Sequence, residues 1–523
     1  MNHNLVEVVK DAAEKYPEDI AIIFKDQKQT YQELWTRVCE IAAGMRAYGL
    51  AYRDRVVICL GNHPDAIAIF WAAQKIGACP SIVAADTPHN KLLYILKNSG
   101  AKHFFTTKAD GYSAAELNGL PELTWVIGCH EQAVTQEKSV RFVDFIRSSE
   151  DEILREPDAI SVDLASIIYT SGSTGEPKGV MLSHQNMMSA TRSLVTYLGY
   201  RKDDRIMAVL PVAFDYGLYQ IIMAFYVGAS VVLEADGVLP PVVLRHIQQY
   251  QCTVMPGLSS LYALLDTYAS RGSFDLGCVR LASNTGMALR WQHIEMLKRL
   301  FPAAEYFSMY GLTECKRCTY LPPADLERKP DSVGIAIPNM QIMVIDEHGQ
   351  PCPEGVVGQL IIRSDMVMQG YWRNEQATAE KIGIHPVYGD KCLYSGDYGW
   401  LDSDGYFYFV GRMDEVAKIR GRKVIFSEVE KALYLHDDII EAAVIVRTSE
   451  DEAESDIIAF YATQNGQQLN EFELKQFCGG ILEHYQIPQV FIHMTNLPKN
   501  ANGKFDKHRL RERYQEKLQG NTV

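Results

Sequence analysis

Short apolar runs alternate with amphipathic segments over most of this chain, and this alternation limits the possible folds more than any other feature of the sequence. Thr30, followed by Glu33 three residues later, has the pattern of a capping box and predicts a helix over residues 31–48. Strand-like runs are expected at residues 55–60, 103–106, 167–169, 206–210, 230–233 and 253–255, and further helices at residues 65–77 and 90–99. A strand–helix rhythm of this kind predicts parallel-rich sheets covered by helices.

The pattern changes after about residue 330, where short strands separated by Gly, Pro and Asp turns replace the strand–helix rhythm. These strands are expected at residues 341–345, 358–363 and 406–410. The last stretch predicts a small α+β unit, with helices at 427–435 and 471–484 and strands at 442–446 and 456–462. The sequence thus predicts an α/β protein with a large N-terminal domain and a small C-terminal domain. Their expected bounds are residues 1–413, with a β-rich subdomain over about 330–413, and residues 414–523.

Composition and charge narrow the functional classes. The 51 Lys and Arg against 65 Asp and Glu give a formal charge of −14, which argues against nonspecific binding to nucleic acid or to an anionic membrane. The longest largely apolar run, residues 221–233, is too short to span a bilayer. The 11 Cys are scattered, and the C-x-x-C pair of Cys315 and Cys318 has no second pair, so a zinc site is not expected. These features are typical of a cytoplasmic protein.

The sharpest motif is the stretch Tyr169-Thr-Ser-Gly-Ser-Thr-Gly-Glu-Pro-Lys-Gly179, which follows a predicted strand. Its Gly, Ser and Thr residues offer backbone N–H groups and hydroxyls that can surround phosphate oxygens, and Lys178 adds a positive charge. The phosphate loop of nucleoside triphosphatases needs Gly-x-x-x-x-Gly-Lys-Ser/Thr, but here Pro177 precedes Lys178 and Gly179 follows it. The motif therefore indicates a site for ATP that differs from the site of kinases and GTPases.

This stretch resembles the signature loop of the AMP-forming adenylating enzymes, which include acyl-CoA synthetases, adenylation domains of nonribosomal peptide synthetases and firefly luciferase. Further segments resemble the family's other motifs in the same order: Gly77-Ala-Cys-Pro-Ser81 with Asp86, Tyr310-Gly-Leu-Thr-Glu314, Gly358-Gln-Leu-Ile-Ile-Arg363 with Gly370-Tyr-Trp372, Tyr394-Ser-Gly-Asp397 with Gly399 and Gly405, Gly411-Arg-Met-Asp414, Lys418-Ile-Arg-Gly421 and Pro498-Lys-Asn-Ala-Asn-Gly-Lys504. The resemblance covers nearly the whole chain.

The resemblance implies a reaction in two halves that uses ATP and Mg²⁺. A carboxylate attacks the α-phosphorus of ATP, which gives an acyl-adenylate and pyrophosphate, and a thiol then displaces AMP. Two anions meet in the first half, so positive charge must stabilise the transferring phosphorus. Lys504 is implied to bridge the substrate carboxylate and the α-phosphate, Glu314 to hold Mg²⁺, and Thr313 to contact phosphate.

The resemblance also implies the remaining contacts to ATP or AMP. Tyr310 would stack on adenine, and Asp397, assisted by Arg412, would accept hydrogen bonds from the ribose hydroxyls. The residues implied to line the nucleotide are Thr170, Ser171, Gly172, Ser173, Thr174, Gly175, Lys178, Asn284, Thr285, Gly286 and Gly311. Asp414 matches the family's hinge, about which the small, mobile domain turns between the half-reactions, and Gly421 matches the place where a pantetheine arm passes.

The acid substrate is indicated by a second set of matching positions. In amino-acid adenylation domains an Asp after an aromatic residue pairs with the α-ammonium of the substrate, and Asp215 follows Phe214 here. By the same resemblance the pocket is lined by Phe214, Asp215, Tyr216, Tyr219, Pro256, Ser283, Thr285, Met309, Arg317 and Cys318. The segment is similar to stand-alone enzymes that load L-proline onto a carrier protein for pyrrole-type natural products. A small α-amino acid such as L-proline is therefore expected, in nonribosomal peptide or antibiotic biosynthesis.

Other possibilities stay open at this point. The chain also resembles acyl-CoA synthetases that act on a non-amino carboxylic acid, in which Asp215 would be satisfied by Arg317 or Lys316. More remote alternatives are a non-catalytic relic of the family and an oxidative member of the luciferase kind. The sequence contains no G-G-x-S attachment segment of a carrier domain. The thiol is therefore expected to arrive in trans, on a phosphopantetheinyl carrier protein or as coenzyme A.

Overall fold

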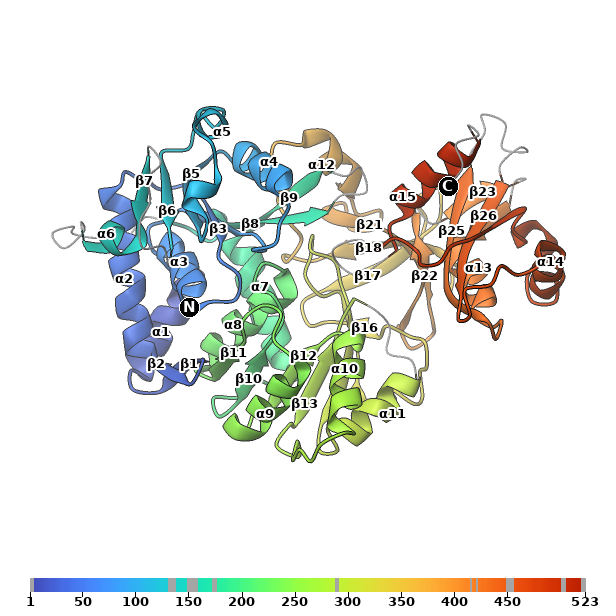
Figure 1. Cartoon of the computed structure of the whole chain (residues 1–523), viewed down its shortest axis with the longest axis horizontal. Helices are drawn as coiled ribbons and strands as arrows, with labels where there is room; N and C mark the ends of the chain where they lie inside the picture. Colours follow the sequence, from blue (N-terminus) through green and yellow to red (C-terminus); the bar gives the residue numbers. More distant parts are fainter. Residues whose placement is uncertain are drawn as a thin grey trace. The chain divides into compact units, whose positions relative to one another are not determined.

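The computed structural model describes residues 4–129, 138–147, 159–171, 176–286, 291–413, 416–419, 422–447, 456–499 and 505–518 (Figure 1). The chain divides into two compact units. The large unit comprises Met1–Met343, Ile361–Tyr394 and Ser403–Phe407, and the small unit comprises Val344–Leu360, Ser395–Asp402 and Tyr408–Val523. The chain therefore passes between the units several times, within the β-rich segment that the sequence indicates after about residue 330.

A mixed sheet of the large unit has the strand order β16-β15-β14-β13-β12-β10-β11-β1-β2, and neighbouring strands from β14 to β1 run parallel. The bounds are β1 Ile20–Phe24, β2 Gln27–Thr30, β10 Arg205–Ala208, β11 Ser230–Leu233, β12 Val254–Gly257, β13 Leu281–Asn284, β14 Glu305–Tyr310, β15 Thr319–Leu321 and β16 Ile335–Ala336. The helices of this region are α7 His184–Leu198, α8 Asp215–Val227, α9 Pro240–Tyr250, α10 Ser259–Ala269 and α11 Trp291–Leu300. The parallel strands are short and almost entirely buried, as expected for a sheet that helices cover on both faces.

A second sheet has the strand order β4-β3-β5-β6-β7, and its strands pair in parallel. Its strands are β3 Arg55–Cys59, β4 Cys79–Ile82, β5 Ala101–Thr106, β6 Trp125–Gly128 and β7 Ser139–Arg141, and the helices of this part of the chain are α1 Glu7–Lys15, α2 Tyr31–Ala47, α3 Pro64–Lys75, α4 His89–Ser99, α5 Ala114–Asn118 and α6 Phe142–Arg147. The predicted capping box opens α2: the Glu33 N–H donates to Thr30 Oγ1 at 3.2 Å, and the Thr30 N–H donates to Glu33 Oε2 at 2.8 Å. The predicted strand–helix alternation is thus confirmed in both sheets.

The described residues on the two sides of the Gly/Ser/Thr stretch form paired strands. Strands β8 (Leu164–Ser171) and β9 (Pro177–Ser183) pair antiparallel, with Thr170 opposite Lys178. Strand β19 (Gly370–Tyr371) pairs with β9 in the same sheet. The paired region is longer than the sequence predicts, because Pro177, Lys178 and Gly179 have low intrinsic strand propensity and are held extended by the pairing itself.

The β-rich segment after residue 330 is confirmed. Its sheet has the order β17-β18-β21-β20, and β22 also pairs with β21. The strands are β17 Gln341–Ile345, β18 Gly358–Arg363, β20 Ile382–Ile384, β21 Lys391–Leu401 and β22 Phe407–Arg412, with helix α12 at Glu375–Lys381. Short 3₁₀ turns occur at η1 Ala109–Gly111, η2 Pro323–Asp325 and η5 His484–Gln486. Each predicted strand of this segment is present, with bounds that differ by at most two residues.

The C-terminal part of the small unit is an α+β structure with its own core. Its strands are β23 Val416–Ile419, β24 Arg422–Ile425, β25 Ile439–Arg447, β26 Asp456–Thr463 and β27 Val490–His493, and its helices are α13 Phe426–Leu433, α14 Glu471–Gly479 and α15 Lys507–Leu518. Helix α14 is shorter than the predicted helix over residues 471–484. Gly480 directly follows Gly479 at its end, and consecutive glycines have a low helix propensity. One face of this part packs around Val429, Leu433 and Leu474.

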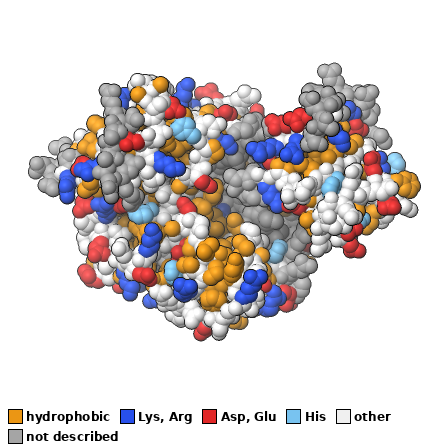
Figure 2. Space-filling model, viewed as in Figure 1, with side chains coloured by type: hydrophobic (Ala, Val, Ile, Leu, Met, Phe, Trp, Pro, Cys, Tyr) orange, Lys and Arg blue, Asp and Glu red, His pale blue; other side chains and the backbone are white. Residues whose placement is uncertain are grey.

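The α/β architecture expected from the sequence, with a large N-terminal and a small C-terminal part, is confirmed. Figure 2 shows acidic and basic side chains interspersed over the visible face of the large unit. Within the described residues, no helix is both long enough and apolar enough to cross a membrane.

Candidate active site

The residues expected to line the acid pocket gather at one edge of the mixed sheet. Pro256, Ser283 and Met309 lie at or next to the carboxyl ends of the parallel strands β12, β13 and β14. Pro256 is paired with Ser283, and Ser283 with Phe307, so the three strands bring these residues to neighbouring positions. Open α/β sheets bind ligands outside the carboxyl ends of their strands. The strand order therefore puts this set where α/β enzymes hold their substrates.

Helix α8 supplies the aromatic residues of the expected pocket. Phe214 is the N-cap residue and is 43% exposed, whereas Tyr216 and Tyr219 are buried. The Tyr216 hydroxyl donates to the Ser283 carbonyl at 2.8 Å and lies 2.9 Å from Ser283 Oγ. Burial raises the pKa of Tyr216 to about 12 against the opposing effect of Ser283, so the phenol stays protonated at neutral pH. These contacts tie the first turn of α8 to β13.

Asp215 and Arg317 form an ion pair inside the expected pocket. Arg317 Nη1 lies 3.5 Å from Asp215 Oδ2, and the two side chains are 7% and 17% exposed. The guanidinium also lies over the Tyr216 ring, 4.6 Å from its centroid. A carboxylate that is mostly removed from water is costly unless a cation or hydrogen bonds compensate it. Arg317 therefore acts as an internal partner for Asp215, which is the arrangement expected for the acyl-CoA synthetase interpretation.

Lys316 is buried beside this ion pair, with only 2% of its surface exposed. Its ammonium lies 4.5 Å from the centroid of the Tyr219 ring. Among the described residues, Lys316 Nζ has no hydrogen-bond partner. Burial lowers the pKa of Lys316 to about 8, and the negative charge of Asp215 opposes this effect. We refer to Asp215, Lys316 and Arg317 as the charge cluster; it contains more positive than negative side chains.

The chain folds back on itself between the end of β14 and β15. The Cys318 N–H donates to the Tyr310 carbonyl at 2.8 Å. Gly311 permits this close approach, since a Cβ atom there would lie 2.1 Å from the Lys316 carbonyl oxygen. The buried thiols of Cys315 and Cys318 have their sulfurs 3.2 Å apart. This fold-back joins the Tyr-Gly-x-Thr-Glu motif to Lys316 and Arg317 of the charge cluster within one short segment.

Met309 contacts an aromatic pair that the sequence did not indicate. The Tyr197 hydroxyl, from α7, lies 2.9 Å from Met309 Sδ and donates a hydrogen bond to it. The Tyr197 ring stacks on the Tyr320 ring, with 4.2 Å between the centroids. Met309 is buried, so its side chain and these two rings form a packed apolar region next to the carboxyl end of β14.

Glu314 and Thr313 lie in a turn of the fold-back and are both partly exposed. The Tyr371 hydroxyl donates to Glu314 Oε1 at 2.6 Å, and the Met368 N–H donates to the Glu314 carbonyl at 2.7 Å. In the described part of the chain, no group of three or more His, Cys, Asp or Glu side chains is placed to hold a metal. Mg²⁺ often uses one or two carboxylates together with substrate phosphates and water. A single carboxylate held on a fixed turn fits that ligand set.

The expected phosphate-binding hairpin shares a neighbour with Glu314. Thr170 Oγ1 donates across the hairpin to the Lys178 carbonyl at 3.4 Å. The Lys178 ammonium lies 5.6 Å from the centroid of the Tyr371 ring, and the hydroxyl of the same tyrosine contacts Glu314. Tyr371 therefore links the lysine of the hairpin to the carboxylate expected to hold Mg²⁺, a role that its place in the Gly-Tyr-Trp motif does not predict.

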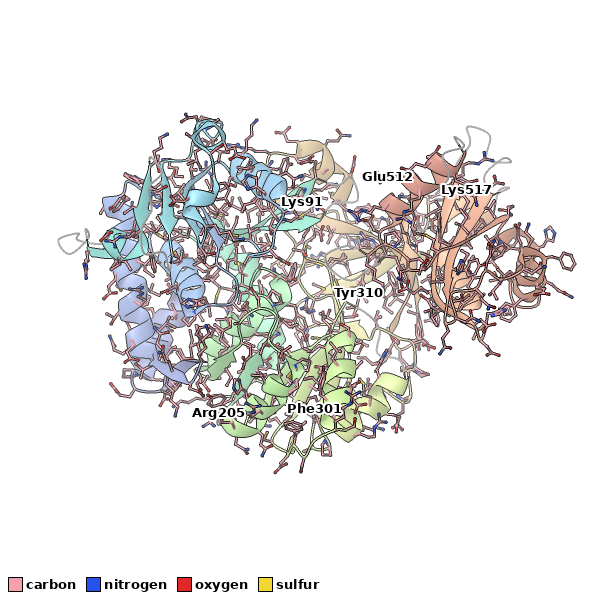
Figure 3. The ribbon with its side chains drawn as sticks, viewed as in Figure 1. Lys91, Arg205, Phe301, Tyr310, Glu512 and Lys517 are labelled. Carbon is pink, nitrogen blue, oxygen red and sulfur yellow. The ribbon has the colours of Figure 1, made fainter. Side chains whose placement is uncertain are left out.

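The residues expected around the base lie at the ends of β13 and β14. Asn284 Oδ1 accepts from Ser259 Oγ at 3.3 Å, and Asn284 is buried. Thr285 follows it, and Gly286 has a φ of +82°, which a residue with a side chain adopts only with strain. Tyr310, labelled in Figure 3, is the last residue of β14. Because β13 and β14 are neighbours, this set and the acid pocket lie at the same edge of the sheet.

Asp397 and Arg412, both in the small unit, are brought together. Arg412 Nε lies 3.4 Å from Asp397 Oδ1, and the Asp397 side chain is buried. The Asp397 N–H donates to Ser395 Oγ at 3.0 Å. The two residues come from β21 and β22, which pair with each other. The carboxylate and guanidinium expected at the ribose are thus neighbours in space.

Part of the expected site lies outside the described residues. This part comprises Gly172, Ser173, Thr174, Gly175, Asp414, Gly421 and Lys504. Lys316 is named from the sequence as a possible partner of Asp215, but its burial is not expected, because hydropathy predicts an exposed lysine. Tyr197 gives no sequence signal, because tyrosines occur throughout the core of this chain. The motif that contains Tyr371 does not indicate its contact with Glu314.

Comparison with known sequences finds relatives over nearly the whole chain. The family described as AMP-binding enzyme matches residues 9–372, and its AMP-binding enzyme C-terminal domain matches residues 428–504. Gramicidin S synthase 2 of Brevibacillus brevis is 29% identical over 516 residues, which are 98% of this chain and 11% of that protein. Bacitracin synthase 1 of Bacillus licheniformis is 30% identical over 522 residues, 97% of this chain and 9% of that protein. The chain thus spans only a small part of the length of these two relatives.

Solved structures with the same fold agree with the match to the AMP-binding enzyme family. ATP-bound MatB from Rhodopseudomonas palustris has a TM-score of 0.86 with this chain at 26% identity, and the match covers 99% of both chains. The anthranilate CoA ligase AuaEII, in complex with anthranoyl-AMP, has the same fold with a TM-score of 0.84 at 24% identity, over 99% of this chain and 98% of that one. The family match extends over well more than half of the sequence. The chain therefore belongs to the AMP-binding enzyme family and is an adenylating ligase.

Proposed function

We propose that this enzyme activates a small carboxylic acid with ATP, forms the acyl-adenylate and pyrophosphate, and passes the acyl group to a phosphopantetheine thiol that arrives in trans. The observation that carries the proposal is the fold-back after β14. It joins the Tyr-Gly-x-Thr-Glu motif, expected at the nucleotide, to Arg317 and Cys318, expected at the acid. An acid in the pocket and a nucleotide on the motif would then meet at the carboxyl end of one strand.

Each charged residue has a defined part in this proposal. Lys504 bridges the substrate carboxylate and the α-phosphate, so that two anions can approach each other. Glu314, fixed by Tyr371, would hold Mg²⁺ together with phosphate oxygens, and the ion would supply positive charge to the phosphates. Asp397 and Arg412 hold the ribose, and Tyr310 packs against adenine. The hydroxyl-rich hairpin with Lys178 binds the outer phosphates.

In this proposal a C-terminal domain, residues 414–523, takes two orientations, one for each half-reaction, and turns between them about Asp414. Lys504 serves the adenylation position. Gly421 serves the thiol-transfer position, because the absence of a side chain leaves a path for pantetheine. Hinge residues in enzymes absorb such rotations through a few backbone dihedral angles.

An α-amino acid of about the size of L-proline is one candidate substrate. It is supported by the similarity to gramicidin S and bacitracin synthases and by the place of Asp215 in the first turn of α8, where it is partly exposed. The buried rings of Tyr216 and Tyr219 would leave a compact apolar space. With this candidate, Asp215 pairs with the α-ammonium, and a separate carrier protein receives the aminoacyl group.

A non-amino carboxylic acid, transferred to coenzyme A or a carrier thiol, is the second candidate, and the geometry supports it best. Asp215 already has Arg317 as its partner at 3.5 Å. Lys316 adds a second buried cation, 4.5 Å from the Tyr219 ring centroid. An α-ammonium brought into this charge cluster would add a further positive charge to a site with little water, which is unfavourable. An acid without an amine avoids that cost.

ATP–pyrophosphate exchange tests the proposal and separates the candidates. The full chain is assayed with the twenty amino acids and with short fatty, aryl and dicarboxylic acids. Exchange with L-proline and loss of it in Asp215→Ala would favour the amino-acid candidate. Exchange with an acid that lacks an amine, and none with proline, would favour the second. The ligase proposal itself fails if no acid supports exchange.

A further inference from the structure

Lys316 is a buried cation whose hydrogen-bonding capacity is not used by the described residues. Its side chain is 2% exposed, and Nζ finds no hydrogen-bond partner among the residues that the structure describes. The Asp215 carboxylate pairs instead with Arg317, at 3.5 Å. An ammonium has three N–H donors and is strongly hydrated in water, so its burial without an acceptor is costly. Such a group in a native structure calls for an explanation.

The aromatic ring beside the ammonium carries a second polar group without a hydrogen-bond partner among the described residues. The Tyr219 hydroxyl is buried and has no hydrogen-bond partner among the described residues. Lys316 Nζ lies 4.5 Å from the centroid of the Tyr219 ring, so the ammonium lies beside the ring that carries this hydroxyl. The phenol can donate one hydrogen bond and the ammonium up to three. Together they offer donors to a group that brings acceptors.

The charges around Lys316 are unbalanced. The charged groups that act on it are Asp215, which is paired with Arg317, then Arg317 itself, and more weakly Glu314, which accepts from Tyr371. Two cations and one carboxylate make up the charge cluster, and a single additional negative group would balance it. Electrostatic complementarity of this kind selects ligands by penalising those that leave a buried charge unpaired.

The backbone at Lys316 supports a functional reason for its position. Lys316 has a φ of +70°, a left-handed conformation that is uncommon for residues other than glycine. The Gly311 Cα faces the Lys316 carbonyl so closely that a Cβ would lie 2.1 Å from it. The fold-back thus holds this lysine in a strained conformation and directs its side chain to the buried Tyr219 ring. Strain of this sort persists where surrounding structure enforces it, often at binding sites.

We propose that Lys316, with the Tyr219 hydroxyl, binds a second carboxylate at the far end of the substrate, so that the enzyme activates a compact dicarboxylic acid. The inference rests on the proposed function, because it assigns one carboxylate to adenylation and the other to the charge cluster. A carboxylate suits the site, since its two oxygens can accept from the ammonium and the phenol together. The net charge of the occupied cluster is then zero.

The test compares matched acids on matched variants of the full chain. Pyrophosphate exchange is measured with dicarboxylic acids of three to eight carbons and with phthalic acids, each beside its monomethyl ester. Wild type should prefer a diacid over its ester. Lys316→Met should lower kcat/KM for that diacid by about 10²–10³, as expected when one partner of a buried charge pair is removed, and should leave the ester unchanged or improve it. Lys316→Arg should retain part of the preference.

Two controls separate binding from folding. Lys298→Met makes the same change at an exposed lysine of α11, which pairs with Glu327 at 2.9 Å, and should leave the diacid preference unaltered. The Tm of Lys316→Met without ligand should be equal to or above that of wild type, because the variant removes a buried charge that lacks a partner. A diacid should raise the Tm of wild type more than that of Lys316→Met.

The outcomes are distinct. A reversed preference in Lys316→Met together with an unimpaired Tm supports the inference. A wild-type preference for monocarboxylic or amino acids overturns the inference and leaves the ligase proposal intact. A lowered Tm with equal losses for diacid and ester assigns Lys316 a structural role and also overturns it. Exchange with no acid at all overturns the proposed function, and the inference falls with it.

Discussion

At the residue scale, the ion pair of Asp215 and Arg317 decides how the acid pocket is understood. An Asp after an aromatic residue is shared by amino-acid adenylation domains and other members of the family, so the residue type alone does not say what it binds. The 3.5 Å contact to Arg317 gives the carboxylate a partner within the protein. The main role of Asp215 is therefore to keep Arg317 in place over the Tyr216 ring.

A double-mutant cycle measures this pairing. Asp215→Asn and Arg317→Met should each lower the free energy of unfolding by roughly 3 kcal/mol, at the low end for a buried pair because Asp215 is 17% exposed. The double variant should be less destabilised than the sum of the two, since neither charge of the pair is left behind without the other. Urea unfolding of the full chain gives these values. Strictly additive losses would show that the two side chains do not interact.

The motif residues of the site and the possible partners of Asp215 could be named from the sequence, whereas the burial of Lys316 could not. Glu314, Asp397 and Arg412 lie in linear motifs, and the structure places Arg412 against Asp397 as expected. The burial of Lys316 depends on the fold-back enforced by Gly311, which is a property of packing rather than of local sequence. Hydropathy predicts that a lysine is exposed, so the sequence did not indicate the burial of this residue.

At the scale of secondary-structure elements, the N-terminus of α7 shows how a buried histidine fastens two segments. His184 is the first residue of α7, and its Nδ1 accepts the Leu5 N–H at 3.0 Å. Burial lowers the pKa of His184 to about 4 from its ordinary value of 6.5. The neutral imidazole is therefore the form that supports the contact between α7 and the residues before α1.

The pH dependence of stability follows from this shift. The unfolded chain takes up a proton on His184 near pH 6.5 while the folded chain resists until about pH 4, so protons favour unfolding in that window. The contribution of neutral His184 to the free energy of unfolding is complete above pH 6.5. It is lost as the pH falls towards 4, by up to about 3 kcal/mol. His184→Gln should flatten the dependence of unfolding free energy on pH between these values. The exposed His348→Gln should not change it, and an equal effect of both variants would contradict this explanation.

The elements themselves were predicted well where one physical cause dominates. The capping box fixed the start of α2, because two side chains satisfy backbone N–H groups there. The predicted end of α14 was wrong, since the apolar pattern continued past Gly479 while the glycines stopped the helix. The order of the strands could not be predicted from the sequence pattern, because crossover connections determine which strands pair in parallel and local periodicity does not encode them.

At the scale of the whole molecule, the two half-reactions are proposed to depend on different residues of the C-terminal domain. Lys504→Ala should lower adenylation by about 10²–10³, as expected for loss of one preorganised charge, and should largely spare thiolation of a supplied acyl-adenylate. Gly421→Leu should do the reverse, because a side chain would block the thiol. Pyrophosphate exchange and thioester formation are measured separately for each variant. Equal losses in both assays would contradict the division of roles.

The central claim, that this chain is an AMP-forming ligase for a compact acid with a second carboxylate, is tested most directly by ATP–pyrophosphate exchange. Wild-type protein is assayed with ATP and Mg²⁺ and, in parallel, with a dicarboxylic acid, its monomethyl ester and L-proline. We expect exchange that depends on the acid and is fastest with the diacid, with AMP as the nucleotide product once a thiol is added. Exchange that is fastest with proline or the ester, or conversion of ATP to ADP and phosphate, would contradict the claim.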